Sequence, residues 1–166
     1  MIRGINAVMR TAAFALILCC IGGCCEQQRD TTLIHTSVNA AGEFWATVND
    51  GESRRLLQEA QAYRPVLSPD GDWLAVEVRL MSDLSVVRLF QRVGETLVAT
   101  DPDITTRAWH WALAGTDVQL GELSHARTLV AGWDSDAQTL LLVLSATLPD
   151  DEPFETVITL PLDQEP

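Results

Sequence analysis

The sequence predicts an all-β domain, and two observations support this prediction. From Leu33 onward, short apolar segments alternate with clusters of Gly, Pro, Asp and Asn, which is the pattern of strands joined by tight turns. One of these turns, Ser68-Pro69-Asp70-Gly71, is followed by two consecutive candidate strands. We therefore expect an antiparallel meander, with a β-sandwich as the alternative.

Eight segments have the composition and length of strands. In chain order they are residues 33–38, 43–48, 73–80, 84–91, 107–113, 128–132, 139–145 and 155–162. Residues 53–62 are ambiguous, because Leu56, Leu57 and Ala60 have helical spacing in a segment too short to separate a helix from a strand.

The first residues have the features of an export signal. Arg3 and Arg10 precede an apolar run from residue 11 to residue 23. The run is shorter than the roughly 18 to 20 residues that cross a hydrocarbon core, so a membrane-spanning helix is not expected. Its last residues, Ile21-Gly22-Gly23-Cys24, resemble the lipobox of bacterial lipoproteins.

This resemblance implies a division of the chain and a location. Residues 1–23 are expected to be a signal peptide that is removed, Cys24 a lipidated N-terminus carrying fatty acyl chains such as palmitate, and residues 24–32 a tether. Residues 33–166 are expected to form a single β-rich domain. Cys25 stands where an inner-membrane lipoprotein would have aspartate, so the resemblance implies the outer membrane, with the domain facing the periplasm.

Charge and composition exclude several classes of function. Removal of Arg3 and Arg10 leaves nine arginines against 23 acidic residues, a formal net charge of −14. Such a chain is expected to repel nucleic acid. Lysine is absent, which excludes a P-loop lysine and Schiff-base chemistry. With Cys24 lipidated, Cys25 is the last free thiol and no intramolecular disulfide is expected.

The clearest repeat unit is the segment 65–100, which contains the turn Ser68-Pro69-Asp70-Gly71. Pro69 sets the first corner of this turn, Asp70 can bond the backbone ahead of it, and Gly71 is expected to take a positive φ. The unit resembles one blade of the TolB-type, WD40-like (PD40) β-propeller repeat. The resemblance implies that these four residues have a structural role.

Three weaker echoes place Gly42, Gly115 and Ala137 where Gly71 lies in the clearest unit. Propellers close with four to eight blades, whereas this chain has material for about three. A closed monomeric propeller is therefore not expected. The remaining alternatives are an open stack of blades, a fragment that closes by oligomerising, or a sandwich that uses the same turn.

The sequence contains no recognisable catalytic or metal-binding constellation, so we assign no catalytic residue, metal or cofactor. The histidines have no metal-motif spacing, and no serine lies in a nucleophile-elbow motif. The acidic clusters at residues 101–103, 134–136 and 150–152 lack the pattern of a calcium loop. The histidines are His35, His110 and His125.

Trp109 and Trp111 are the speculative binding residues. In the strand predicted for residues 107–113, they lie on the same face, where two indoles can stack a ligand or anchor a partner. Core packing is the competing interpretation for both.

The function hypothesis is a lipid-anchored envelope lipoprotein that acts as a non-catalytic protein-binding or scaffolding module in the periplasm. It is held to the membrane by lipid on Cys24 and has an envelope protein as its partner. Two alternatives are an accessory subunit completed by another chain and a calcium- or carbohydrate-binding module.

Overall fold

The described residues form an almost entirely β structure, as the sequence predicts, together with one α-helix that was not predicted. The computed structural model describes residues 33–58, 60–101 and 104–162. Contacts divide the chain into Met1–Asp30 and Thr31–Pro166, and every described residue belongs to the second unit. The predicted signal peptide, Cys24 and the tether lie outside the described residues.

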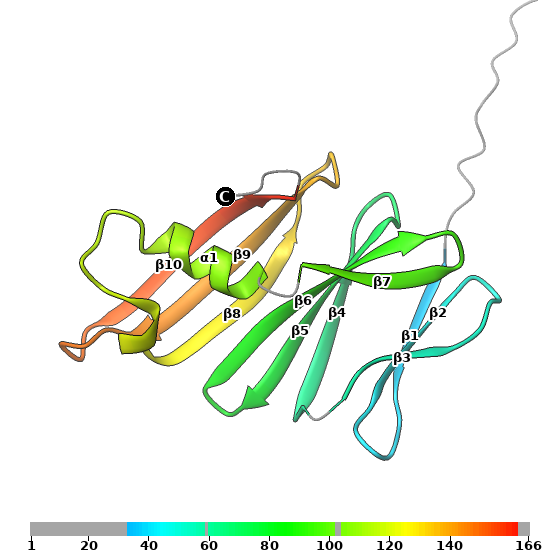
Figure 1. Ribbon diagram of the computed structural model, residues 1–166, viewed down its shortest axis with the longest axis horizontal. Coiled ribbons are helices and arrows are strands. Elements are labelled where there is room, and N and C mark those ends of the chain that lie inside the picture. Colours follow the sequence, from blue (N-terminus) through cyan, green and yellow to red (C-terminus); the bar gives the residue numbers. More distant parts are fainter. Residues whose placement is uncertain (1–32, 59, 102–103, 163–166) are drawn as a thin grey trace, which may run out of the picture. The chain divides into compact units, whose positions relative to one another are not determined.

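The described strands form two sheets, one of three strands and one of seven (Figure 1). The seven-stranded sheet consists of two antiparallel meanders joined edge to edge by a parallel bridge. We call the three-stranded sheet the first blade and these two meanders the second and third blades. The first blade contains β1 (Ile34–Val38), β2 (Phe44–Val48) and β3 (Arg54–Leu57). The second contains β4 (Ala62–Leu67), β5 (Trp73–Met81), β6 (Leu84–Val93) and β7 (Thr96–Asp101). The third contains β8 (Ser124–Trp133), β9 (Thr139–Thr147) and β10 (Pro153–Pro161). Helix α1 (Ile104–Ala112) and the short 3-10 helix η1 (Leu120–Glu122) connect β7 to β8.

The strand predicted for residues 107–113 is wrong, because these residues lie in and just after α1. The buried residues Ala108 and Trp109 follow the buried Ile104 by four and five positions, which places all three on one side of a helix. The ambiguous segment 53–62 contains the strand β3. The structure also adds β4 and β7, two strands that the eight predicted segments did not include.

On the edge of β6 opposite β5, the backbone groups bond to three different partners. Ser85 pairs with Arg127 of β8 in the single parallel bridge between the second and third blades. At the next outward position, the Val87 N–H donates to Thr105 Oγ1 at 2.8 Å, and that hydroxyl donates to the Val87 carbonyl at 3.2 Å. From Leu89 onward, β6 pairs with β7. The edge is thus divided between a strand, the start of α1 and a second strand.

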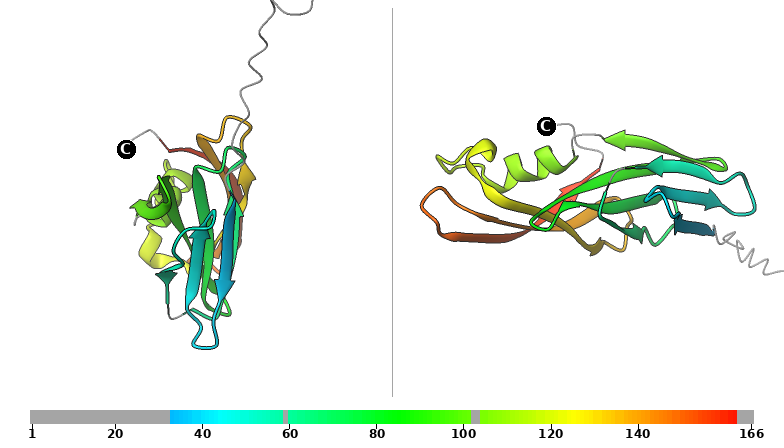
Figure 2. Two further views of the ribbon diagram at one scale, coloured as in Figure 1. Left: turned by 90° about the vertical axis from the view of Figure 1, so that its right-hand side faces the viewer. Right: turned by 90° about the horizontal axis from the view of Figure 1, so that it is seen from below.

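The second blade has a hydrophobic core on each face. Figure 2 shows two further views of the sheets, in which α1 lies over one face of the strands. Even-numbered residues of β5, such as Leu74 and Val76, pack with Phe44 and Val48 of the first blade. Ala75 on the opposite face belongs to the core formed with α1 and the third blade. The alternation follows from the period of two in a strand. One face of the second blade therefore packs on the first blade, and the other face contributes to the core shared with α1 and the third blade, which continues the same sheet.

Polar contacts also join the second and third blades. Glu77 Oε2 accepts from Arg64 Nη1 at 3.1 Å and from the Val130 N–H at 3.4 Å. Arg64 Nη1 also donates to the Val130 carbonyl at 2.9 Å. The indole N–H of Trp133 donates to the Val66 carbonyl at 3.1 Å. The two bonds to Val130 satisfy backbone groups of β8 that face away from β9, and the Trp133 bond satisfies a carbonyl of β4.

The turn Ser68-Pro69-Asp70-Gly71 has the predicted geometry. Gly71 has φ of 75° and its N–H donates to the Ser68 carbonyl at 3.0 Å. Asp70 Oδ1 accepts from the Asp72 N–H at 3.0 Å, which is the forward bond expected of this residue. The buried Ser68 hydroxyl donates to Asp70 Oδ1 and accepts from the Trp73 N–H. The turn therefore joins β4 to β5 as a closed hydrogen-bonded unit.

Two of the three weaker copies of this repeat unit have the same turn conformation. Gly42 has φ of 76° and donates to the Asn39 carbonyl, and Ala137 has φ of 59° and donates to the Asp134 carbonyl. Each lies in the turn between the first and second strands of its blade, as Gly71 does. Gly115 does not share this role, because it follows the C-terminal end of α1. Residues 104–123 are therefore an insertion between the second and third blades.

Candidate interaction surface

The third blade has one covered face and one open face. On the covered face, side chains of β9 are fully buried against α1 and the second blade; these are Leu140, Leu142 and Leu144. The Trp109 indole of α1 packs on the same face, where its Nε1 donates to Thr128 Oγ1 at 3.0 Å. Trp109 and Phe154 also form a tilted ring pair with centroids 6.0 Å apart.

An apolar row crosses the open face. Leu129 of β8 pairs with Val143 of β9, which pairs with Val157 of β10, so the three side chains are direct cross-strand neighbours. Val157 is 61% exposed, the highest value among the exposed large hydrophobic residues. Leu129, Val143 and the adjacent Leu141 are partly buried but belong to neither hydrophobic core. A polar row lies beside it, because Arg127 pairs with Ser145, which pairs with Glu155. The open face thus presents an aliphatic row among polar residues.

The outer face of the first blade is more polar. His35 pairs with Thr47, and Ser37 pairs with Trp45, which pairs with Arg55. Arg55 Nη1 forms an ion pair with Glu43 at 2.5 Å, and this bond is the main cause that holds the pKa of Glu43 below its ordinary value. The outer faces of the first and third blades therefore differ in polarity.

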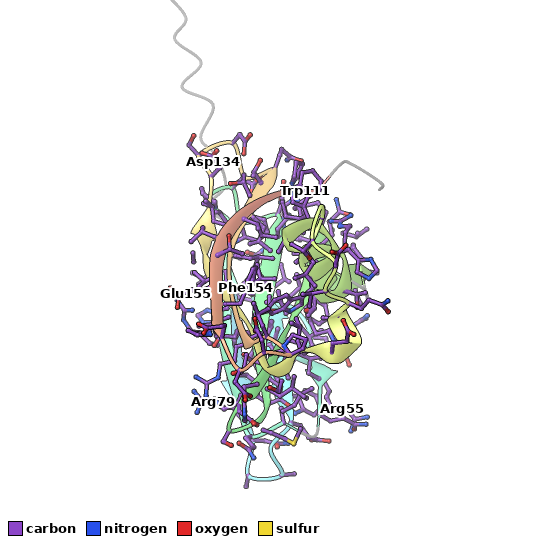
Figure 3. The ribbon with its side chains drawn as sticks, turned by 90° about the vertical axis from the view of Figure 1, so that its left-hand side faces the viewer. Arg55, Arg79, Trp111, Asp134, Phe154 and Glu155 are labelled. Carbon is purple, nitrogen blue, oxygen red and sulfur yellow. The ribbon has the colours of Figure 1, made fainter. Side chains whose placement is uncertain are left out.

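The free edge of β10 offers backbone hydrogen-bonding groups at odd-numbered residues. The Leu162 N–H donates to the Gln138 carbonyl, and the Leu148 N–H donates to the Glu152 carbonyl. These two bonds flank β10 and both involve even-numbered residues of its side of the ladder. Because bonded positions alternate in an antiparallel ladder, the even-numbered residues of β10 bond to β9 and the odd-numbered residues face the free edge. The outward groups belong to Glu155, Val157 and Thr159, together with the carbonyls of the two terminal prolines. Figure 3 shows Phe154 and Glu155 on opposite sides of β10.

One edge of the open face is held by a polar clasp. His125 Nδ1 lies 2.6 Å from Asp83 Oδ2, and Arg127 Nη2 donates to the Ser82 carbonyl at 2.8 Å. His125 has φ of 55° in a bulged part of β8. The hydrogen bond to His125 is the main cause that lowers the pKa of Asp83. The clasp fixes the β5–β6 turn to the start of β8.

The structure separates the two predicted tryptophans. Trp109 is 1% exposed and lies in the core, whereas Trp111 is 52% exposed. They do not form the common face expected from a strand, because residues two apart on a helix point in different directions. The core-packing interpretation is confirmed for Trp109. Trp111 remains a candidate contact residue, and Figure 3 shows it away from Glu155.

The histidines lie apart from one another. His35 is exposed on β1, His125 belongs to the clasp, and His110 borders an open groove of about 440 Å³ between α1 and η1. The rest of this groove is lined by Leu113, Val118, Gln119, Leu120 and Gly121. In the part of the chain that the structure describes, no three His, Cys, Asp or Glu side chains are grouped so as to hold a metal ion.

Sequence reasoning missed the open face of the third blade. Residues 140–144 are a continuous apolar run, which is typical of a strand buried on both faces. The alternation in residues 154–160 was the available signal, because it places Val157 opposite Ile158 and Leu160.

Comparisons with protein-family models, curated proteins and solved structures find no match for this chain. None of the helices among the described residues has the length and apolar character needed to span a membrane.

Proposed function

We propose that the chain is a lipid-anchored envelope lipoprotein that acts as a non-catalytic protein-binding or scaffolding module. Ile21-Gly22-Gly23-Cys24 supports the anchor, because it combines an apolar signal with small residues before a cysteine. By its resemblance to a lipobox, the protein is held at the outer membrane and faces the periplasm. Cys24 is the residue that carries the lipid.

The open face of the third blade is the observation that supports protein binding. Its central row, Leu129, Val143 and Val157, is aliphatic and crosses three strands without contact to either core. Exposed apolar surface of this kind marks interaction sites in soluble domains. A partner surface of aliphatic side chains buries this row and removes the exposed methyl groups of Val157 from water.

A pull-down from detergent-solubilised membranes tests the binding surface. Val157→Arg places a charge at the exposed end of the row and is expected to abolish recovery of the partner. Val93→Arg is the matched control, because Val93 is 57% exposed but lies on β6 of the second blade. Equal recovery with both variants would contradict a binding role for the open face.

The anchor has a separate test. Cys24→Ala is expected to abolish labelling by a radioactive fatty acid and to release the protein from membranes. Cys25→Ser is the control, because it removes a neighbouring thiol and leaves Cys24 unchanged. Persistence of both label and membrane association in Cys24→Ala would refute the assignment.

The aliphatic row of the open face also favours an accessory subunit whose third blade is completed by another chain. The two outer faces differ, since that of the first blade presents His35, Thr47 and Arg55 where the third presents an aliphatic row. In this alternative, the partner supplies a blade that packs on Leu129 and Val143. Stoichiometric recovery of one partner in the pull-down would support it.

A further inference from the structure

We infer that the free edge of β10 pairs with β10 of a second copy of this chain, in an antiparallel arrangement about a two-fold axis. This inference rests on the proposed protein-binding role and names the partner. Strand addition at an exposed edge gives affinity through backbone bonds, and side chains determine which strand is accepted. Among the described residues, no strand pairs with β10 on the side opposite β9.

The sequence of β10 is arranged symmetrically about its central residue. β10 is Pro153–Pro161, so Val157 lies at the centre and a proline lies at each end. A two-fold axis at Val157 pairs Val157 with its copy, Glu155 with Thr159 of the second copy, and Pro153 with Pro161 of the second copy. An isologous interface requires this kind of self-complementarity.

The outward backbone groups match this register. Glu155, Val157 and Thr159 each present an N–H and a carbonyl to the free edge, which follows from the alternation established by the Leu162 and Leu148 bonds. Both prolines lack an N–H and fall on outward positions, where a proline is tolerated in an edge strand. The pairing therefore ends at the two prolines, and its donors and acceptors are equal in number in the two copies.

The charge pattern favours this antiparallel register. Glu155 is the only acidic residue of β10, and the two-fold axis places it opposite Thr159 rather than opposite its own copy. The two Glu155 side chains are then four residues apart, about 14 Å along the strand. This distance exceeds the screening length of about 8 Å at physiological ionic strength. A parallel pairing in register would instead align the two carboxylates.

The arrangement also continues the apolar row of the open face. In one copy, Leu129, Val143 and Val157 follow one another across three strands. With Val157 paired to its copy, the row extends without interruption to Val143 and Leu129 of the second chain. A head-to-tail contact between the third blade of one copy and the first blade of the next is less favourable, since it buries polar residues such as His35 and Thr47 against this row.

Single cysteines test the register directly. In the full chain with Cys25→Ser, Val157→Cys is expected to form a disulfide-linked dimer under mild oxidation. Its Cα–Cα distance to the copy is about 5.5 Å in a hydrogen-bonded pair, within the usual range of about 4.4–6.8 Å for disulfides. Glu155→Cys is the matched control and is expected to form no disulfide-linked dimer alone, because the two cysteines lie too far apart in the paired strands. Mixed with Thr159→Cys chains, it is expected to form a disulfide-linked heterodimer.

Two outcomes would overturn the inference. One is equal cross-linking of Val157→Cys and Glu155→Cys, and the other is a monomeric wild-type chain in light scattering of the detergent-solubilised protein. Thr159→Pro gives a second measurement, because it removes one outward N–H without removing a bond to β9. It is expected to convert dimers to monomers while the β-sheet circular dichroism is retained.

The failure of this inference is distinguishable from that of the proposed function. If Val157→Arg abolishes recovery of a different envelope protein and Val157→Cys forms no dimer, the binding role stands and the second copy is excluded. If the cysteine pattern is as expected but Cys24→Ala remains in the membrane with its lipid label, the dimer stands and the anchor is wrong.

Discussion

At the scale of single residues, Asp83 makes the stability of the fold depend on pH. Its pKa is lowered chiefly by the hydrogen bond to His125, so the folded chain binds this proton less readily than the unfolded chain. The contribution is present above the ordinary aspartate pKa of about 3.9 and is lost as the pH falls through the lower folded value. Asp83→Asn is therefore expected to lower the melting temperature at pH 7. It is also expected to make the melting temperature less dependent on pH in the acidic range.

Thermal melts between pH 7 and pH 3 measure this difference. Asp117→Asn is a matched control, because Asp117 is an exposed acid in the loop after α1. An unchanged melting curve for Asp83→Asn would contradict a stabilising role of the clasp.

Positive φ angles in the turns lead to a second residue-scale prediction. Gly71 has φ of 75°, and an L-residue pays about 1–2 kcal/mol in the left-handed region. Gly71→Ala is expected to lower the free energy of unfolding by about this amount. Asp151 has φ of 65° and is exposed, so Asp151→Gly relieves strain and is expected to be neutral or slightly stabilising. Urea titrations measure the change in the free energy of unfolding of each variant. A stabilising effect of Gly71→Ala would contradict the turn assignment.

At the scale of elements, α1 gives Trp109 and Trp111 opposite energetic roles. Trp109 is buried and bonds Thr128, whereas Trp111 is largely exposed. Trp109→Ala is expected to cost about 3–5 kcal/mol through loss of burial and the resulting cavity. Trp111→Ala is expected to change stability by no more than about 0.5 kcal/mol. Chemical denaturation compares them directly, and equal large losses would favour the common strand face over the helix.

The same helix shows what the sequence did and did not predict. Strands next to turn signals were predicted because Gly, Pro and Asp mark their ends, as at Gly42 and Gly71. Residues 107–113 were predicted as a strand because they form a short apolar run between turn signals, whereas burial of Ile104, Ala108 and Trp109 in the core shared with the third blade stabilises a helix. Local propensity is weak compared with tertiary packing of an amphipathic face.

The candidate surface was less predictable than the fold. Val143 and Leu141 lie in an apolar run that resembles a strand covered on both faces, and only the arrangement of the blades leaves one face open. The tether and Cys24 depend on a motif alone.

At the scale of the whole domain, the second blade couples the other two. It contributes Leu74 and Val76 to the core shared with the first blade, and Ala75 and Val87 to the core shared with the third. Separation of either neighbouring blade exposes one of these faces to water. We therefore expect one cooperative unfolding transition, in which far-ultraviolet circular dichroism and tryptophan fluorescence coincide.

Glu77 tests this coupling, because its largely buried carboxylate connects the second and third blades. Its side chain is 12% exposed, and Oε2 accepts from Arg64 and from the Val130 N–H. Glu77→Ala removes the acceptor for both donors and is expected to cost about 1–3 kcal/mol, the range for a buried polar group left unsatisfied. Glu95→Ala, in the exposed β6–β7 turn, is the control and is expected to change stability by at most about 0.5 kcal/mol. If Glu77→Ala shifted only the fluorescence transition and left the circular dichroism midpoint unchanged, the third blade would be unfolding independently and the shared core would not couple the blades.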